Sequence, residues 1–281
     1  MEPLPSELPS FEPGWVWLAG AGPGDPGLLT LHAFHGLRRA DAVVYDALVS
    51  EAILKLAAPG AALEFAGKRG GKPSPTQADI CHRLVRLARL GKRVLRLKGG
   101  DPMVFGRGGE EALSLVAAGI PFRIIPGISA GIGGLAYAGI PVTHRDTNSV
   151  VTFLTGHNAA GVVPDQVDWP AVARGSPVLV IYMALKHLHA IAERLLAAGR
   201  TGGEPVALVS NATLPSQRVV ETTLAACAAE AAAQGLEPPA LVVVGEVVRL
   251  RAGLDWLGAM AGRCLVADPL GVRVSSGSAE A

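Results

Sequence analysis

The chain has 281 residues, of which 49% are hydrophobic and 17% are charged, and its formal net charge is +1. This balance gives no electrostatic reason to expect nucleic acid or an anionic membrane surface as a partner, so an anionic ligand would need local clusters of basic residues. The length allows one large domain or two medium-sized domains, and either arrangement can bury a core.

Strand-like apolar runs alternate with helical patterns along the first half of the chain. The expected strands are 15–19, 42–45, 62–66, 94–97 and 122–125. The clearest helix spans 76–90, where Thr76 with Asp79 resembles a capping box and Gly91 provides a stop. Continuous apolar strands separated by helices predict an α/β domain with a parallel sheet covered on both faces.

A second series of the same kind follows. Its expected strands are 150–154, 178–183, 206–209, 219–222 and 241–244, and its expected helices are 184–198 and 224–234, which end at Gly199 and Gly235. The segment 126–148, rich in glycine and small residues, separates the two series. We therefore predict two α/β domains, residues 14–127 and 128–258, with a cleft between them, and disordered ends at 1–13 and 267–281.

The cysteine pattern and the first residues bear on the compartment. Cys81, Cys227 and Cys264 lie far apart and match neither a disulfide framework nor a zinc-site spacing. The first residues carry acids and prolines, not the basic start and apolar run of a signal peptide. We expect a cytoplasmic protein without a metal.

Two glycine clusters follow expected strands. The stretch from Lys98 to Glu111, KGGDPMVFGRGGEE, has five glycines at a strand-to-helix turn, which favours a loop shaped around a ligand over an ordinary flexible loop. In GAGPGDPG, the spacing of Gly22, Gly24 and Gly27 fits the dinucleotide fingerprint, and Asp46 ends the second strand. Pro23 and Pro26, however, remove N–H groups that a pyrophosphate would need, which favours a ligand without phosphate.

Eight motifs, in order from about residue 15 to 255, resemble those of the uroporphyrinogen-III C-methyltransferases, within the tetrapyrrole methyltransferases. They are GAGPGDPGLLT, VVYDALVS, AGKRGGK, LKGGDPMVFGRGGEEA, IPGISAGIGGLAYAGIPVTHRD, FLTGH, VIYMAL and PPALVVVGEVV. The resemblance implies a mainly parallel first sheet, a mixed second sheet, a homodimer, and S-adenosylmethionine bound in the interdomain cleft. It also implies methylation of C2 and C7 of uroporphyrinogen III, giving precorrin-2 by way of precorrin-1 and feeding cobalamin or sirohaem synthesis, with S-adenosylhomocysteine as the other product.

The resemblance also implies the residues that contact the cofactor. Ser129 stands where the family more often has threonine, and it keeps the hydroxyl. The implied residues are Pro23, Gly99, Gly100, Asp101, Val104, Ser129, Ala130, Met183, Ala212 and Ala240. Without the resemblance, the residue type and position of Met183 would favour a structural role at the end of a core strand.

Catalytic and substrate-binding residues are expected in the same loops. The resemblance marks Asp46 as a possible proton acceptor and Lys68 as a possible donor; the alternative is a surface ion pair between them. Eight substrate carboxylates call for cations, and Arg69 and Arg107 lie in glycine-rich loops. For Arg107 the alternative is that it orders its own loop by pairing with Glu110 or Glu111.

Other functions stay open at this level. They are a methyltransferase acting on a later precorrin, an NAD-dependent dehydrogenase, and a module that binds a tetrapyrrole or nucleotide without chemistry. Relatives fused to a sirohaem-forming dehydrogenase carry an extra N-terminal module, whereas about fourteen residues precede the first strand here, so we expect a monofunctional chain.

Overall fold

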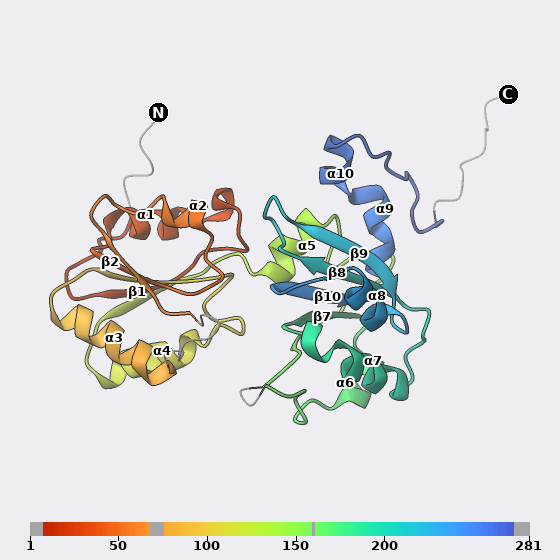
Figure 1. Ribbon diagram of the computed structural model, residues 1–281, viewed down its shortest axis with the longest axis horizontal. Coiled ribbons are helices and arrows are strands. Elements are labelled where there is room, and N and C mark those ends of the chain that lie inside the picture. The colour runs from red at the N-terminus through yellow and green to blue at the C-terminus, as the bar shows by residue number, and fades with distance from the viewer. Residues whose placement is uncertain (1–7, 68–75, 159–160, 273–281) are drawn as a thin grey trace. The chain divides into compact units, whose positions relative to one another are not determined.

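The computed structural model describes residues 8–67, 76–158 and 161–272, and the chain divides into two compact units, Met1–Ala130 and Gly131–Ala281 (Figure 1). Each unit contains one five-stranded sheet with helices packed against it. The predicted class, two α/β domains, is therefore confirmed.

The first unit is built on a parallel sheet in the order β3-β2-β4-β1-β5. Its strands are β1 (Val16–Gly20), β2 (Ala42–Tyr45), β3 (Ala62–Phe65), β4 (Val94–Lys98) and β5 (Phe122–Ile125). All residues of the inner strands β1 and β4 are buried, which is why β1 carries apolar residues at consecutive positions and not only at alternate ones. In β4 the buried residues include Arg96 and Lys98. The prediction of a parallel sheet is confirmed.

Helices cover both faces of this sheet. Figure 1 shows α1 (Leu31–Arg39) and α2 (Glu51–Leu54) on one side and α3 (Gln77–Arg89) and α4 (Gly108–Ala117) on the other, and a separate apolar cluster fills each side. The capping box at the start of α3 is present, and Gly91 follows the helix with a φ of +72°.

The segment before β1 departs from the sequence-based expectation. Phe11 is buried, and its ring stacks on Trp17 of β1 with the centroids 4.2 Å apart. The Nε of Arg93 also donates to the carbonyl of Phe11. The prediction of a disordered end is therefore wrong for residues 8–13, because one aromatic side chain anchors the segment to the core.

The second unit has a mixed sheet in the order β6-β7-β10-β8-β9. Its strands are β6 (Val151–Thr155), β7 (Val178–Tyr182), β8 (Pro205–Ser210), β9 (Arg218–Thr223) and β10 (Ala240–Val244). Strands β6 and β7 are parallel and the other neighbours are antiparallel, which confirms the mixed sheet.

One face of this sheet packs against α6 (Trp169–Gly175), α7 (Leu188–Ala197) and α8 (Cys227–Ala233). The expected helices 184–198 and 224–234 begin late, because a 3₁₀ turn, Leu185–His187, precedes α7 and a turn precedes α8. The unit also contains α5 (Leu135–Tyr137), α9 (Arg251–Leu254) and α10 (Trp256–Met260), and the Trp256 indole donates to the carbonyl of Ala136.

Candidate functional site

The carboxyl ends of β1 and β4 are joined by backbone hydrogen bonds. Gly22 and Gly100 form an antiparallel bridge in which each N–H donates to the carbonyl of the other, at 3.2 and 2.7 Å. The N–H of Ala21 donates to the carbonyl of Lys98 at 2.7 Å. The two glycine clusters found in the sequence therefore form one continuous surface at this edge of the first sheet, where ligands of open α/β sheets bind.

Glycine is required here because backbone packs directly on backbone. A Cβ on Gly20 would lie 2.5 Å from the Cα of Gly127 and the same distance from the carbonyl oxygen of Gly100. Gly100 has a φ of +67°, but a Cβ there would meet nothing closer than 3.9 Å. Gly20 and Gly127 are needed because the backbones approach closely, whereas Gly100 is needed because the turn is left-handed.

Asp101 connects this turn to the end of β5. Its carboxylate accepts from the N–H of Gly127 at 2.9 Å and from the N–H of Met103 at 2.7 Å. The chain then continues to Ser129, which is buried, and to Ala130. The fold thus brings together, at one edge of the first sheet, the expected cofactor residues Pro23, Gly99, Gly100, Asp101, Ser129 and Ala130.

Asp46 lies at the end of β2, beside this turn. Its carboxylate accepts from the N–H of Gly99 at 3.2 Å and from the N–H of Leu48 at 3.0 Å. In the parallel sheet β2 neighbours β4, so the carboxylate meets the second glycine cluster and not the first. A dinucleotide-binding sheet of the order 3-2-1-4-5-6 would place this acid beside the first cluster.

A buried charged cluster beneath the turn was not predicted from the sequence. Glu111 of α4 lies 3.1 Å from a guanidinium nitrogen of Arg96 and 3.0 Å from the Nζ of Lys98, and Gln77 donates to it at 3.0 Å. Arg96 and Lys98 are two residues apart on β4, so their side chains lie on one face of the strand. Two basic residues at this spacing in a buried strand are the signal that could have revealed the cluster.

Burial and charge compete in this cluster. Burial alone would raise the pKa of Glu111, but Arg96 and Lys98 outweigh it and hold the pKa of that carboxyl below its usual value. Burial lowers the pKa of Lys98, as does Arg96, and the attraction of Glu111 and Asp46 opposes this. The carboxylate of Glu111 is thus the anion that makes two buried cations tolerable directly below the glycine turn.

Arg107 pairs locally with Glu110. Its Nε and one terminal nitrogen contact the two carboxylate oxygens at 2.9 and 2.6 Å, and both side chains are more than half exposed, 55% and 57%. The hydrogen bond with Glu110 raises the pKa of Arg107. Pairing with Glu110, left open by the sequence, is present, whereas Glu111 belongs to the buried cluster. Val104 is also exposed on this loop.

The remaining expected cofactor residues meet at one edge of the second sheet. Met183 follows β7, Ala212 follows β8, and Ala240 begins β10. The antiparallel register pairs Ala240 with Ser210 and Leu241 with Tyr182, which places these three positions at the same edge. Met183, Asn211 and Thr213 have positive φ angles of 55°, 50° and 67°. Such strain in residues other than glycine is concentrated at functional sites.

Two expected residues, Lys68 and Arg69, lie outside the described residues, so the structure places neither of them. The segment that follows β5 contributes another contact at the edge of the second sheet: the N–H of Gly131 donates to the Tyr182 hydroxyl at 2.9 Å. A Cβ on Gly131 would overlap that hydroxyl, which explains the glycine.

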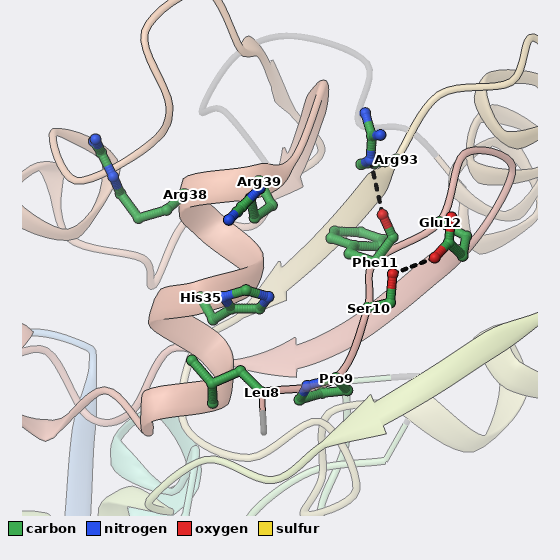
Figure 2. Close-up of a pocket in the computed structure, with 9 residues that line it drawn as sticks. All are labelled: Leu8, Pro9, Ser10, Phe11, Glu12, His35, Arg38, Arg39 and Arg93. Carbon is green, nitrogen blue, oxygen red and sulfur yellow. Dashed lines mark hydrogen bonds between the residues drawn. The ribbon is translucent and has the colours of Figure 1, made fainter. Parts of the chain in front are cut away.

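A separate cavity of about 500 Å³ lies between α1 and the segment before β1 (Figure 2). Two of its three arginines bind the protein's own groups: Arg38 donates to the carbonyls of Leu56 and Ala57, and Arg93 donates to Phe11 and Asp41. Because Arg93 immediately precedes β4, the cavity is at the amino ends of the parallel strands. It is therefore remote from the glycine turns, and Arg38 and Arg93 hold local backbone.

Among the residues that the structure describes, no helix is both long and apolar enough to cross a membrane. All three cysteines are free; Cys81 and Cys227 are buried and Cys264 is exposed.

Comparison with known proteins identifies a family match over most of the chain. The sequence profile of the Tetrapyrrole (Corrin/Porphyrin) Methylases matches residues 16–228. A uroporphyrinogen-III C-methyltransferase from a Sinorhizobium species is 68% identical over 267 residues, which are 95% of each chain. Siroheme synthase 3 of Aeromonas hydrophila is 49% identical over 87% of this chain, and the match covers 52% of that enzyme, so the chain spans about half its length.

A solved structure agrees with these matches. The uroporphyrin-III C-methyltransferase of Thermus thermophilus, complexed with S-adenosylhomocysteine, has a TM-score of 0.71 and 42% sequence identity. The match covers 84% of this chain and 99% of the Thermus chain. The likeness therefore extends through both units of the fold.

Proposed function

The chain belongs to the tetrapyrrole (corrin/porphyrin) methylase family, and on that premise we propose that it transfers methyl groups from S-adenosylmethionine to uroporphyrinogen III. The observation that carries this proposal is the 68% identity, over 95% of both chains, to a uroporphyrinogen-III C-methyltransferase. The finer steps proposed here are methylation at C2 and C7, with precorrin-1 as intermediate and precorrin-2 as product.

Features of the carboxyl edge of the first sheet support S-adenosylmethionine as the cofactor. A Cβ built on Gly100 would lie 3.9 Å from backbone atoms of Ser129 and Ala130, so the glycine turn adjoins two further residues that we propose contact the cofactor. Pro23 and Pro26 leave the first turn short of N–H donors, which suits a ligand without phosphate better than a dinucleotide. The cofactor would supply an activated methyl group. The residues proposed to contact it are Pro23, Gly99, Gly100, Asp101, Val104, Ser129, Ala130, Met183, Ala212 and Ala240.

The protein's contribution to methyl transfer is mainly positioning. Asp101 fixes the turn to β5 and Asp46 fixes the Gly99 amide to β2, so the backbone that would border the cofactor is held from two sides. A rigid surface of this kind holds the methyl group and the attacking pyrrole carbon in line, which lowers the barrier without a strong counter-charge.

Methylation of a pyrrole carbon requires loss of a proton elsewhere on the macrocycle. We assign acceptance of this proton to Asp46, and we assign Lys68 the role of a proton donor to the macrocycle. Two backbone amides fix the Asp46 carboxylate but leave lone pairs available, so it can still accept a proton. The role of Lys68 rests on its sequence motif.

Recognition of the eight substrate carboxylates is assigned to Arg107 and Arg69. Arg107 is exposed and already holds a carboxylate, that of Glu110, through two nitrogens. A guanidinium in this geometry can exchange one carboxylate for another, so a substrate propionate or acetate could replace Glu110. The role of Arg69 rests on its place in a glycine-rich part of the sequence.

The cellular setting is also a proposal. Three free cysteines agree with a reducing compartment, so we place the enzyme in the cytoplasm. We further propose a homodimer whose product enters sirohaem or cobalamin synthesis; the similarity to siroheme synthases supports the sirohaem route.

Anaerobic incubation with S-adenosylmethionine and uroporphyrinogen III tests the function directly. We expect two methyl groups to be incorporated per macrocycle, with the absorption of the oxidised product changing accordingly. Absence of methyl transfer to uroporphyrinogen III would refute the proposal. Transfer only to a later precorrin would retain the chemistry and change the substrate.

A further inference from the structure

The Thr155–Gly156–His157 segment crosses the backbone that follows β7. Thr155 pairs with Tyr182 in the parallel register, and the N–H of Gly156 donates to the Tyr182 carbonyl at 2.7 Å. A Cβ on Gly156 would lie 2.5 Å from the Cα of Ala184. The glycine therefore allows one loop to lie directly on the next.

This close approach brings His157 to Met183. The Nδ1 of His157 lies 3.2 Å from the Met183 carbonyl oxygen. A carbonyl oxygen only accepts hydrogen bonds, so a hydrogen bond at this distance requires the tautomer with the proton on Nδ1. The Thr155 hydroxyl donates to the carbonyl of His157 at 2.9 Å, and this hydrogen bond fixes the backbone of the loop. Each residue of the TGH sequence thus has a physical role in one contact.

Met183 needs such a contact because its backbone is strained and its side chain is not held by a core. Its φ is 55°, a left-handed conformation that residues with a Cβ rarely adopt. The residue is 44% exposed, so packing does not fix where its side chain lies. The direction of that side chain therefore depends on the backbone conformation.

We propose that His157 is a positioning residue, whose ring N–H holds the carbonyl of Met183 and keeps Met183 in the left-handed conformation that presents its side chain beside Ala212 and Ala240. The consequence for ligand binding rests on the function proposed above, in which Met183 contacts the cofactor. The effect on the backbone of Met183 is independent of that function.

Substitution of His157 tests the binding consequence. His157→Leu removes the donor, whereas His157→Asn places an amide N–H near the position of Nδ1. We expect His157→Leu to raise the dissociation constant of S-adenosylhomocysteine, measured by calorimetry, on the order of fivefold, the usual size for one hydrogen bond. His157→Asn should restore most of the affinity.

The same substitution elsewhere provides a matched control. His189 lies on α7, exposed and paired with Glu193, so His189→Leu should leave the dissociation constant unchanged. The steady-state KM for S-adenosylmethionine should follow the dissociation constants across the series. Equal affinities for His157→Leu and His157→Asn would overturn the proposed role in binding.

A double-mutant cycle with Met183→Gly tests the backbone role without any ligand. Glycine adopts a positive φ without strain, so it needs no brace. Loss of the His157 donor should therefore lower the thermal unfolding midpoint less in the Met183→Gly background than in the wild type.

The two measurements separate the possible failures. An equal drop in the unfolding midpoint in both backgrounds would overturn the backbone role. If the wild-type chain did not bind S-adenosylhomocysteine, the proposed function would fail, and the thermal cycle would still decide whether His157 braces Met183. If His157→Leu does not fold, the comparison of His157→Asn with His157→Ala replaces it in both experiments.

Discussion

The irregular backbone at the candidate-site edges of the two sheets is formed by different kinds of residue. At the first edge, Gly20 and Gly127 allow backbone to touch backbone, and two aspartates hold the resulting turn. At the second edge, Met183, Asn211 and Thr213 adopt left-handed conformations despite their side chains. The first edge is a surface of bare backbone, whereas the second must direct side chains, and only a residue with a side chain can do that.

The buried cluster below the first edge should show the largest effect. Glu111→Gln removes the carboxylate that contacts the buried Arg96 and Lys98, and we expect it to lower the free energy of unfolding by about 3–5 kcal/mol. Urea denaturation at pH 7 measures this. The control is Glu51→Gln. Glu51 forms an exposed pair with Lys55, so this variant should change the free energy of unfolding little. A loss as small as in the control would show that the cluster does not support the turn.

The stability difference between the wild type and Glu111→Gln should depend on pH. The pKa of Glu111 is lower in the folded chain than its ordinary value of 4.5, so its ionised form contributes stability above that pH. This stability is lost as the pH falls through the folded-state pKa. The difference in unfolding free energy between wild type and Glu111→Gln should therefore narrow below pH 4.5. A difference that stays constant down to acid unfolding would contradict the assignment.

The close approach at the first edge comes next. Gly127→Ala would place a Cβ 2.6 Å from the Cα of Gly20 and closer still to the Gly100 carbonyl. We expect a loss of about 2–3 kcal/mol in unfolding free energy, as for overpacking, together with weakened cofactor binding. Gly175→Ala is the control, since a Cβ there meets nothing within 4 Å. Retained stability and affinity in Gly127→Ala would show that the strands can separate without penalty.

One pair of substitutions contrasts the two edges directly. Gly100→Ala imposes a side chain on a φ of +67°, and Met183→Gly removes one from a φ of 55°. We expect the first to lower the unfolding free energy by about 1 kcal/mol and the second to leave it unchanged or raise it by up to about 1 kcal/mol. Met183→Gly should nevertheless weaken cofactor binding. Stability changes of the same sign would show that backbone strain does not distinguish these edges.

The smallest effect on stability is expected at the exposed pair. Arg107→Ala removes an exposed contact with Glu110 and should change the unfolding free energy by less than about 0.5 kcal/mol. Its KM for uroporphyrinogen III should nevertheless rise, because a cation for the substrate carboxylates is lost. An unchanged KM and turnover rate would refute substrate binding by Arg107 and leave it as a residue that only orders its loop.

Much of the fold was predictable because its signals are local. The apolar run of β1 predicts a buried parallel strand, and Thr76, Asp79 and Gly91 mark the ends of α3. The burial of Phe11 was not predictable, since it depends on the ring of Trp17 in the folded sheet. The late start of α7 was also missed, because Ala184 to His187 carry helix-forming residues that tertiary contacts hold in a tighter turn.

By itself the sequence determined the two α/β units, the glycine turns and the family, because periodicity, turn chemistry and long motifs are properties of neighbouring residues. Only the tertiary structure decided what lies beside what. Pairing of β2 with β4 places Asp46 on the Gly99 amide and not beside Gly22. Packing of α4 on β4 buries Glu111 against Lys98, and the loop after β6 brings His157 to Met183. These contacts join residues distant in sequence, and only the pairing of strands and helices selects which of them form.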